Sequence, residues 1–358
     1  MKKTDFMKTA LRLAKKGLNR TGSNPMVGAV IVKNNKIIGK GFHEKFGGSH
    51  AEVNAINNAE ERGSSVANST MFVTFEPCCH FKKKTPPCAQ LIAKKGIKKV
   101  VISMKDPNPK VNGRGIKFLK KNQIETEVGT YEIESKELNK GFASLIKKKR
   151  PFVTLKICTS MDGKIYDIGG NNDNIGDRLQ RKHANELRKE FDSVLVGVNT
   201  IIRDNPQLNY RGNRKNSIQQ PRPIVLDSCL RTPLTSKIVI RGNRPIIFTK
   251  ISPTSKKFKA LVKAGCEIVT LDVLDPKKIL KKLPSLGIQR VLIEGGGKIF
   301  SNFLESKLWD ELIIYYSPKF LGEAGLSLTH NLRTKFLINQ NSEIKVKWVG
   351  RCLMLRIK

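Results

Sequence analysis

The sequence predicts an α/β protein of two domains, the first a three-layer domain with helices on both faces of a sheet. Short apolar segments typical of strands alternate with amphipathic helical segments along the chain. The length of 358 residues exceeds the usual size of one domain. A basic, proline-containing run over residues 145–158 precedes a new strand, so we expect domains of residues 1–146 and 147–358.

The first domain is expected to begin with a helix over residues 5–18, where apolar residues recur at helical spacing. Apolar runs on both sides of Asn34-Asn35 predict a β-hairpin. The other expected elements are a helix over 49–63, a strand over 69–77, a helix over 87–97 that Gly96 ends, and a strand over 98–104.

The second domain shows the same alternation of strands and helices. Strands are expected over residues 152–158, 193–200, 223–227, 244–249, 267–271, 290–297 and 311–320, with helices over 178–191 and 298–306. Residues 211–223, rich in Arg, Asn, Gln and Pro, are expected to form an exposed loop.

The composition is strongly basic, with 67 Lys and Arg against 30 Asp and Glu and a net charge of +37. Such a charge favours an anionic partner, but lysine is abundant throughout the chain, and a general compositional bias explains it equally well. Seven cysteines, an odd number spread over a long chain, argue against a disulfide scaffold. No membrane span or continuous apolar leader is found. We therefore expect a reduced, cytoplasmic protein.

A zinc-binding pattern lies in the first domain. His50 and Glu52 form H-A-E, and E-P-C ending at Cys78 is followed ten residues later by Cys88. One imidazole and two thiolates supply three zinc ligands and leave a position open for water, as in zinc deaminases. A neighbouring glutamate could then move protons to a leaving amine. The alternative is a closed structural site that uses both Cys78 and Cys79, although successive side chains diverge.

A second pattern, "VLIEGGGKIF" at residues 291–300, predicts a strand, three glycines and a helix. Glycines allow backbone amides to approach a phosphate at a helix N-terminus. The spacing is not that of a dinucleotide-binding fingerprint, and a tight turn explains these glycines about as well.

Several longer segments carry a resemblance to a known family. "SNPMVGAVIV", "GFHEKFGGSHAEVNAI", "TFEPCCHFKKKTPPCAQLI" and "DPNPKVNGRGI" resemble the bifunctional riboflavin-biosynthesis deaminase/reductases, as do "KICTSMDGKI" and "GVNTIIRDNPQLNYR". The resemblance implies a cytidine-deaminase-like domain followed by a dihydrofolate-reductase-like domain. It also implies zinc-dependent deamination of 2,5-diamino-6-(5-phosphoribosylamino)pyrimidin-4-one, then NADPH-dependent reduction of the ribosyl group to ribityl.

The same resemblance implies the site residues. In the deaminase these are zinc ligands His50, Cys78 and Cys88, proton shuttle Glu52, and substrate contacts Asn24, His43, His80, Lys84 and Asn108. In the reductase the implied cofactor contacts are Cys158, Asn174, Thr200, Asp204, Ser228, Gly296, Gly297, Lys298, Ile299, Phe300, Ser301 and Asn302. The implied reductase substrate contacts are Asn172, Arg188, Leu208, Arg211 and Glu294.

The chain departs from the family pattern in two places. The "FKKK" loop is one residue longer than usual, and "GGNNDNIGD" at residues 169–177 lacks the usual serine and tryptophan, with Asn172 and Asn174 in their places. This change leaves a deaminase with an impaired reductase half as an alternative. A nucleic-acid deaminase acting on tRNA and a structural zinc module that binds RNA are two further alternatives. We expect a small phosphorylated pyrimidine as substrate, no membrane or nucleic-acid partner, and a homo-oligomer.

Overall fold

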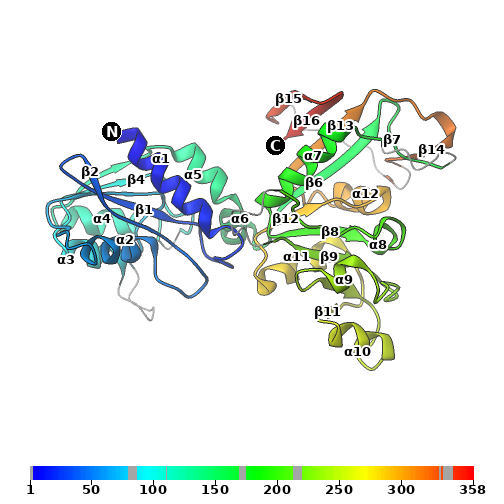
Figure 1. The fold of residues 1–358 in the computed structure, drawn as a ribbon, viewed down its shortest axis with the longest axis horizontal. Coiled ribbons are helices and arrows are strands. Elements are labelled where there is room, and N and C mark those ends of the chain that lie inside the picture. Colours follow the sequence, from blue (N-terminus) through cyan, green and yellow to red (C-terminus); the bar gives the residue numbers. More distant parts are fainter. Residues whose placement is uncertain are drawn as a thin grey trace. The chain divides into compact units, whose positions relative to one another are not determined.

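The structure is a computed structural model that describes residues 3–79, 87–109, 111–168, 175–212, 220–329, 332–333 and 342–358. Figure 1 shows two compact units, Met1–Lys149 and Arg150–Lys358. The boundary expected between residues 146 and 147 falls inside helix α6 (Lys140–Lys148), and the first unit extends to the end of that helix. Strands and helices alternate along the chain in both units, which confirms the predicted α/β class.

The first unit contains a five-stranded sheet in the order β2-β1-β3-β4-β5. β1 is antiparallel to both of its neighbours, β2 and β3, and β3, β4 and β5 run parallel. Its elements are α1 (Lys3–Ala14), η1 (Lys15–Gly17), β1 (Gly28–Lys33), β2 (Lys36–Phe42), α2 (Ala51–Glu60), β3 (Thr70–Val73), α3 (Cys88–Lys94), β4 (Lys99–Ile102), α4 (Arg114–Lys121), β5 (Glu125–Val128), α5 (Glu132–Leu138) and α6.

Helices cover both faces of this sheet because the strand side chains alternate between two apolar cores. One core joins α1 to the face that carries Val30 and Phe72. The other joins α2, α3 and α4 to the face that carries Ile31 and Met71. The predicted three-layer arrangement is therefore confirmed.

The predicted hairpin is present and helps to place the site. Asn34 and Asn35 both have positive φ, as a two-residue turn between β1 and β2 requires. On β2, a side chain at Gly41 would collide with the backbone of Ala51 and Ala55. Only glycine therefore lets α2 pack closely against the strand, which sets the position of the H-A-E segment at the start of α2.

The second unit contains a nine-stranded sheet in the order β11-β10-β9-β8-β12-β6-β13-β16-β15, and a two-stranded sheet of β14 and β7. The strands from β11 to β13 are parallel, whereas β16 and β15 are antiparallel additions at one edge. Its strands are β6 (Phe152–Ser160), β7 (Lys164–Asp167), β8 (Ser193–Gly197), β9 (Arg222–Leu226), β10 (Ile246–Thr249), β11 (Glu267–Thr270), β12 (Arg290–Ile293), β13 (Glu311–Ser317), β14 (Gly325–Ser327), β15 (Ile344–Val349) and β16 (Cys352–Ile357).

Helices flank the large sheet on both faces, packed against separate apolar clusters. The helices of this unit are α7 (Arg178–Leu187), η2 (Arg188–Glu190), α8 (Val198–Asp204), α9 (Lys237–Ile240), α10 (Lys256–Lys263), α11 (Pro276–Lys282), η3 (Leu283–Leu286), α12 (Gly297–Glu305) and η4 (Gly322–Ala324). The strand expected over residues 193–200 was too long, because β8 ends at Gly197 and the chain turns there into α8.

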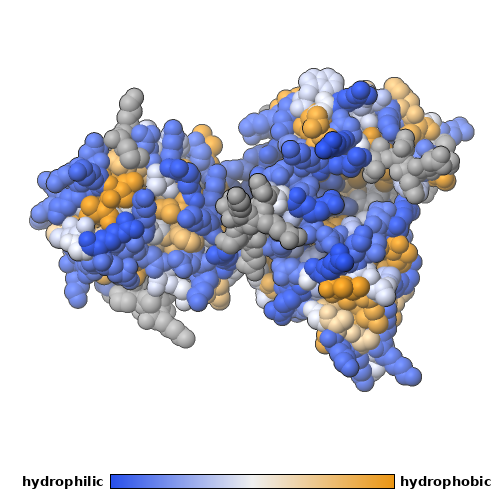
Figure 2. Space-filling view, viewed as in Figure 1, coloured by the Kyte–Doolittle hydropathy of each residue, from blue (hydrophilic) through white to orange (hydrophobic). Residues whose placement is uncertain are grey.

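Within the described ranges, no helix is long and apolar enough to cross a bilayer. Figure 2 shows hydrophilic residues over most of the visible face of both units, with separate apolar patches between them. This distribution agrees with the high lysine and arginine content of the chain.

Candidate functional site

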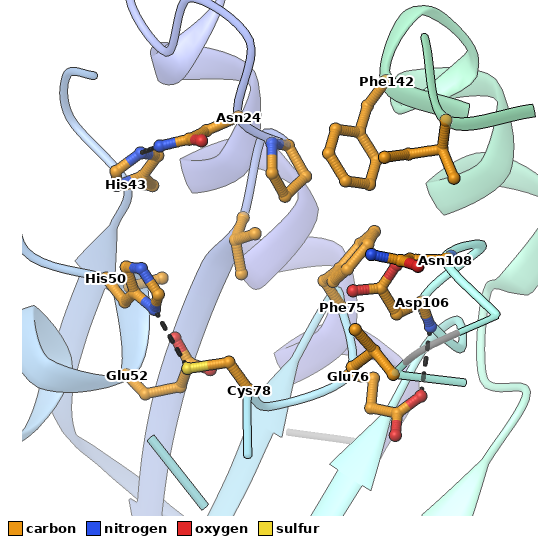
Figure 3. A pocket seen from close by; sticks show the side chains of 15 residues that line it. Asn24, His43, His50, Glu52, Phe75, Glu76, Cys78, Asp106, Asn108 and Phe142 are labelled. Atoms are coloured by element: carbon orange, nitrogen blue, oxygen red, sulfur yellow. Dashed lines mark hydrogen bonds between the residues drawn. The ribbon is translucent and has the colours of Figure 1, made fainter. Parts of the chain in front are cut away.

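Three potential metal ligands meet in the first unit, and Figure 3 shows two of them, His50 and Cys78. His50 is the N-cap of α2, Cys78 follows β3 in a segment without regular structure, and Cys88 is the first residue of α3. The ligand atoms of these three residues lie within 4.8 Å of one another.

The geometry of this cluster fits zinc. His50 Nδ1 lies 3.2 Å from Cys88 Sγ and 3.5 Å from Cys78 Sγ. Tetrahedral zinc, with bonds of about 2.0–2.1 Å to nitrogen and about 2.3 Å to sulfur, places such atoms about 3.5 Å apart. One nitrogen and two sulfurs would leave a fourth position for a small ligand.

The local electrostatics favour a cation at the sulfurs. A hydrogen bond from the Cys88 thiol, helped by His50, lowers the pKa of Cys78 to about 4 against the effect of burial. The same hydrogen bond raises the pKa of Cys88, so this pair holds one thiolate. Burial raises the pKa of Glu52 to about 7, although His50 acts in the opposite direction. The Glu52 carboxyl group is therefore suited to hold or release a proton near neutral pH.

Cys79 lies apart from the ligand set. Its side chain is half-buried and packs against the core beneath α2 and α3. Burial, followed by the nearby Glu76 and Cys78, raises the pKa of the Cys79 thiol, which therefore stays protonated.

A cavity of about 250 Å³ opens beside the cluster. It is lined by Asn24, Pro25, Val27, His43, His50, Ala51, Glu52, Phe75, Glu76, Cys78, Asp106, Asn108, Val111, Phe142 and Ile146. The structure thus brings Asn24, His43 and Asn108, three of the expected substrate contacts, to one cavity with Glu52. The other two, His80 and Lys84, lie outside the described residues.

Two of these side chains are joined by a directional hydrogen bond. The amide Nδ2 of Asn24 lies 3.1 Å from His43 Nε2, and His43 Nδ1 lies 3.0 Å from the carbonyl oxygen of Ser49. Since a carbonyl only accepts, His43 carries its proton on Nδ1 and accepts from Asn24 at Nε2. This arrangement fixes the orientation of the Asn24 amide at the edge of the cavity.

The sequence did not reveal the apolar wall of the cavity. Phe75 follows β3, and Phe142 and Ile146 belong to α6 and line the cavity. Figure 3 shows the rings of Phe75 and Phe142. The rings of Phe75 and Phe142 pack edge to face with centroids 5.7 Å apart. No local pattern marked these residues, because they meet only after α6 has folded back onto the sheet.

The second unit has a larger cavity of about 660 Å³. It is lined by Lys156, Cys158, Ile165, Tyr166, Asp167, Ile175, Gly176, Gln180, Arg181, Ala184, Asn185, Arg188, Arg203, Asp204 and Arg211. The expected residues Cys158, Asp204, Arg188 and Arg211 therefore share one cavity. Asn172 and Asn174 lie outside the described residues.

Two residues that line this cavity, Arg188 and Lys156, belong to a buried cluster of ion pairs around Glu294. Arg188 donates to both carboxylate oxygens of Glu294, from Nη2 at 2.7 Å and from Nε at 3.2 Å. Lys156 Nζ lies 3.8 Å from the same carboxylate. Burial acts to raise the pKa of Glu294, but Lys156, Arg188 and Arg211 outweigh it and lower the pKa to about 2. Glu294 therefore stays ionised and orients the Arg188 guanidinium.

The remaining cofactor residues lie where three neighbouring parallel strands end. α8, with Thr200 and Asp204, follows β8, Ser228 follows β9, and the glycines follow β12. Carboxyl ends of parallel strands meet at one sheet edge, where ligands usually bind. The predicted strand–glycine–helix segment is confirmed, with Gly296 as N-cap of α12.

Not every expected residue there offers a side chain to a ligand. Phe300 and Ser301 are buried against the core side of α12, whereas Gly296, Lys298 and Asn302 are exposed. Leu208 is buried among the apolar residues around α8. Phe300 and Leu208 could therefore contact a ligand only through their backbones. Cys158 lines the cavity as a thiol, because burial raises its pKa to about 12.

Two protein families match the chain, one in each unit. The family described as the cytidine and deoxycytidylate deaminase zinc-binding region matches residues 1–104. The family described as the RibD C-terminal domain matches residues 151–346.

Full-length relatives match both units together. The riboflavin biosynthesis protein RibD of Aquifex aeolicus is 41% identical over 325 residues, which cover 90% of this chain and 89% of that protein. The Escherichia coli protein of the same name is 32% identical over 327 residues, or 88% of each chain.

Solved structures give the same result. A crystal structure of a Thermotoga maritima diaminohydroxyphosphoribosylaminopyrimidine deaminase/5-amino-6-(5-phosphoribosylamino)uracil reductase is 37% identical, with a TM-score of 0.84 over 99% of this chain and 98% of that one. Acinetobacter baumannii RibD is 34% identical, with a TM-score of 0.83 over the same shares.

Proposed function

This chain belongs to the RibD family of bifunctional riboflavin-biosynthesis enzymes, and we propose that each of its two units holds one of the two active sites. Membership confirms the predicted cytidine-deaminase-like and dihydrofolate-reductase-like folds, and the predicted deaminase and reductase function. It does not support the alternative of a nucleic-acid deaminase, because the RibD C-terminal domain accounts for residues 151–346.

For the first unit we propose hydrolytic deamination of 2,5-diamino-6-(5-phosphoribosylamino)pyrimidin-4-one. The observation that carries this proposal is the convergence of His50, Cys78 and Cys88 beside the buried Glu52, at the end of one cavity. These three ligands would hold zinc, which would make hydroxide available near neutral pH. The reaction replaces the 2-amino group of the pyrimidine by oxygen and releases ammonia.

Glu52 would move the protons in this reaction. Its carboxylate would accept a proton from the attacking water and return it to the amino group that leaves. A pKa of about 7 suits both roles, because the group can then exist in either state at neutral pH. Burial also keeps bulk water from competing for this proton.

The rest of the cavity would recognise the pyrimidine. The Asn24 amide, oriented by His43, and the Asn108 side chain offer hydrogen bonds to the ring edge. Phe75 and Phe142 offer an apolar surface to the ring face. A cavity of about 250 Å³ has room for a single pyrimidine ring.

For the second unit we propose NADPH-dependent reduction of the ribosyl group. The bound cofactor would supply hydride to C1′ of the open-chain sugar, which becomes ribityl. The exposed start of α12 and the end of α8 would hold the cofactor. Arg188 and Arg211 would grip the 5′-phosphate, for which guanidinium groups have the right geometry.

Product analysis tests both proposals together. The purified protein is incubated with the diaminopyrimidine, with and without NADPH, and the products are identified by mass. We expect ammonia and the deaminated product without NADPH, and the same product carrying two more hydrogens with NADPH. If the protein and NADPH gave only the deaminated product, the reductase half would be impaired, as the altered 169–177 segment allows.

The choice of Cys78 over Cys79 as ligand can be tested by metal analysis. Cys79→Ser should keep zinc and deaminase activity, because its thiol packs against the core away from the ligand cluster. Cys78→Ser should lose both, because it removes one of three protein ligands. Zinc is measured by elemental analysis of the purified variants. Loss of zinc from the Cys79 variant alone would show that the ligand assignment is wrong.

The glycines after β12 should be needed for NADPH binding. A Cβ at Gly296 would meet no protein atom within 4 Å, and the backbone there is extended, so a side chain adds no backbone strain at this position. Gly296→Val should therefore keep the parent's unfolding temperature, while its branched side chain fills the space that a phosphate needs. Fluorescence titration should show NADPH binding weakened about tenfold or more. Unchanged affinity would mean that the glycines serve only as a turn.

A further inference from the structure

A buried carboxylate in the first unit has a role that the ligand cluster does not explain. We propose that Glu76 is a positioning residue of the deaminase, which fixes the Asp106–Asn108 loop against the metal-ligand segment so that Asn108 faces the substrate. The proposal rests on the deaminase function proposed above. It concerns Glu76 alone, which neither the zinc set nor the proton transfer requires.

The Glu76 carboxylate accepts four hydrogen bonds from the backbone. Oε2 accepts from the amides of Asp106 at 3.1 Å and Gly113 at 3.0 Å. Oε1 accepts from those of Gly115 at 3.0 Å and Ile116 at 3.4 Å. These amides belong to the loop that follows β4 and to the first turn of α4, more than 29 residues further along the chain.

Backbone amides, and not a cation, satisfy this charge. The residue is 3% exposed, and no ion pair joins it to a lysine or arginine in the described part of the chain. A carboxylate at a helix N-terminus is favoured, because the free amides of the first turn point toward it. The four hydrogen bonds therefore hold two distant segments in one arrangement.

This arrangement leads directly to the substrate cavity (Figure 3). Glu76 lies two residues before the ligand Cys78, and Glu76, Asp106 and Asn108 all line the cavity. Asp106 in turn contacts Asn108, because its Oδ1 accepts a hydrogen bond from the backbone amide of Asn108 at 2.8 Å. A side chain at Gly115 would collide with the carbonyl oxygen of Pro77, so the start of α4 packs directly on the ligand segment.

The substitution Glu76→Gln tests the hydrogen bonds of Glu76 without changing how much space its side chain fills. The substitution keeps the size of the side chain but puts an NH₂ group in place of one acceptor oxygen, where it would face two backbone donors. The loop must shift to avoid them, and Asn108 shifts with it. We expect kcat/KM for deamination to fall about tenfold or more, with one zinc per chain retained, since His50, Cys78 and Cys88 are unchanged.

The decisive measurement is a double-mutant cycle with Asn108→Ala. If Glu76 acts through Asn108, adding Glu76→Gln to the Asn108→Ala chain should cause little further loss of kcat/KM. Ser69→Ala is the matched control. Ser69 is buried at the other end of β3 and donates to the carbonyl of Val66 at 2.6 Å. It should lower the unfolding temperature without changing kcat/KM.

Each outcome decides the matter. Multiplicative effects of the two substitutions, or full activity of Glu76→Gln, would overturn the positioning role. If Glu76→Gln does not fold, the same cycle is run with Glu76→Asp, which keeps the charge and shortens the side chain, and the same non-additivity is expected. A parent protein that folds and binds zinc but does not deaminate the pyrimidine would contradict the proposed function instead.

Discussion

Replacing Glu52 by glutamine should lower the rate of ammonia release by about 10²–10⁴-fold, the usual contribution of a general acid–base group. The amide is nearly the same size as the carboxyl group, and Glu52 is not among the residues whose ligand atoms cluster for a metal. We therefore expect zinc and the unfolding temperature to remain close to those of the parent. Ammonia release and bound zinc are measured on the same preparation.

Among the described residues that line the cavity, no other carboxyl group is placed to replace Glu52. The Glu76 carboxylate accepts hydrogen bonds from four backbone amides, and the Asp106 carboxylate accepts one from the backbone amide of Asn108. Glu52 lies in the first turn of α2, two residues from the ligand His50, and is 3% exposed. Its loss should therefore not be compensated from within the cavity.

A matched control comes from the same helix. Glu60 lies at the exposed end of α2 and pairs with Lys95 on the surface, an interaction worth about 0–1 kcal/mol. Glu60→Gln should keep the parent's rate of deamination. If Glu52→Gln released ammonia at the parent rate while keeping zinc, the metal site would be structural and the proton-transfer role would be wrong.

The sequence predicted those parts of the protein whose signals are local. The two asparagines between apolar runs specified the hairpin, and "EGGG" after an apolar run specified the end of β12 and the start of α12. H-A-E, E-P-C and the later cysteine each mark a short segment. These segments meet because the chain leaves β3 close to the points where α2 and α3 begin.

The missed features depend on contacts between distant residues. Val198 continues an apolar β-branched run, yet α8 begins there. At Gly197 a side chain would collide with Ile299, so the end of β8 lies directly against a residue about 100 positions further along the chain. Phe142 becomes a cavity residue only when α6 packs near Phe75. The amide partners of Glu76 lie 30 to 40 residues away, and no pattern within the E-P-C segment indicates them.

Replacing Glu294 by glutamine should damage reduction and leave deamination intact. Its carboxylate holds Arg188 through two hydrogen bonds and lies 3.8 Å from Lys156. The amide can accept from only one of these groups and leaves a buried positive charge uncompensated. Breaking a buried ion pair costs about 3–5 kcal/mol of unfolding free energy, and a displaced Arg188 should raise KM for the phosphorylated substrate.

The pH dependence of stability provides an independent check. The pKa of Glu294 is lowered to about 2 in the folded unit, from an ordinary value of 4.5. Its contribution to stability is therefore complete above about pH 4.5 and is lost as the pH falls toward 2. The difference in unfolding free energy between parent and Glu294→Gln should be largest at neutral pH and shrink in acid.

Glu311→Gln is the control that distinguishes a loss of stability from a loss of reductase function. It is fully buried in the same unit, accepts from Arg356 Nε at 2.7 Å and from Thr154 Oγ1 at 2.9 Å, and does not line the described cavity. Glu311→Gln should destabilise the unit to a similar degree and keep the parent's KM for reduction. An equal rise of KM in both variants would mean that Glu294 is only structural.

The two damaged chains should complement each other when they are mixed. Each unit has its own apolar core, so each substitution should affect only the reaction of its own unit. Glu294→Gln supplies the deaminated pyrimidine, and Glu52→Gln, with NADPH, reduces it to the ribityl product. Product formation by the mixture, and by neither variant alone, shows that the intermediate is released into solution. If each variant keeps its remaining activity but the mixture forms no ribityl product, the intermediate passes directly between sites, and separate release is the wrong account.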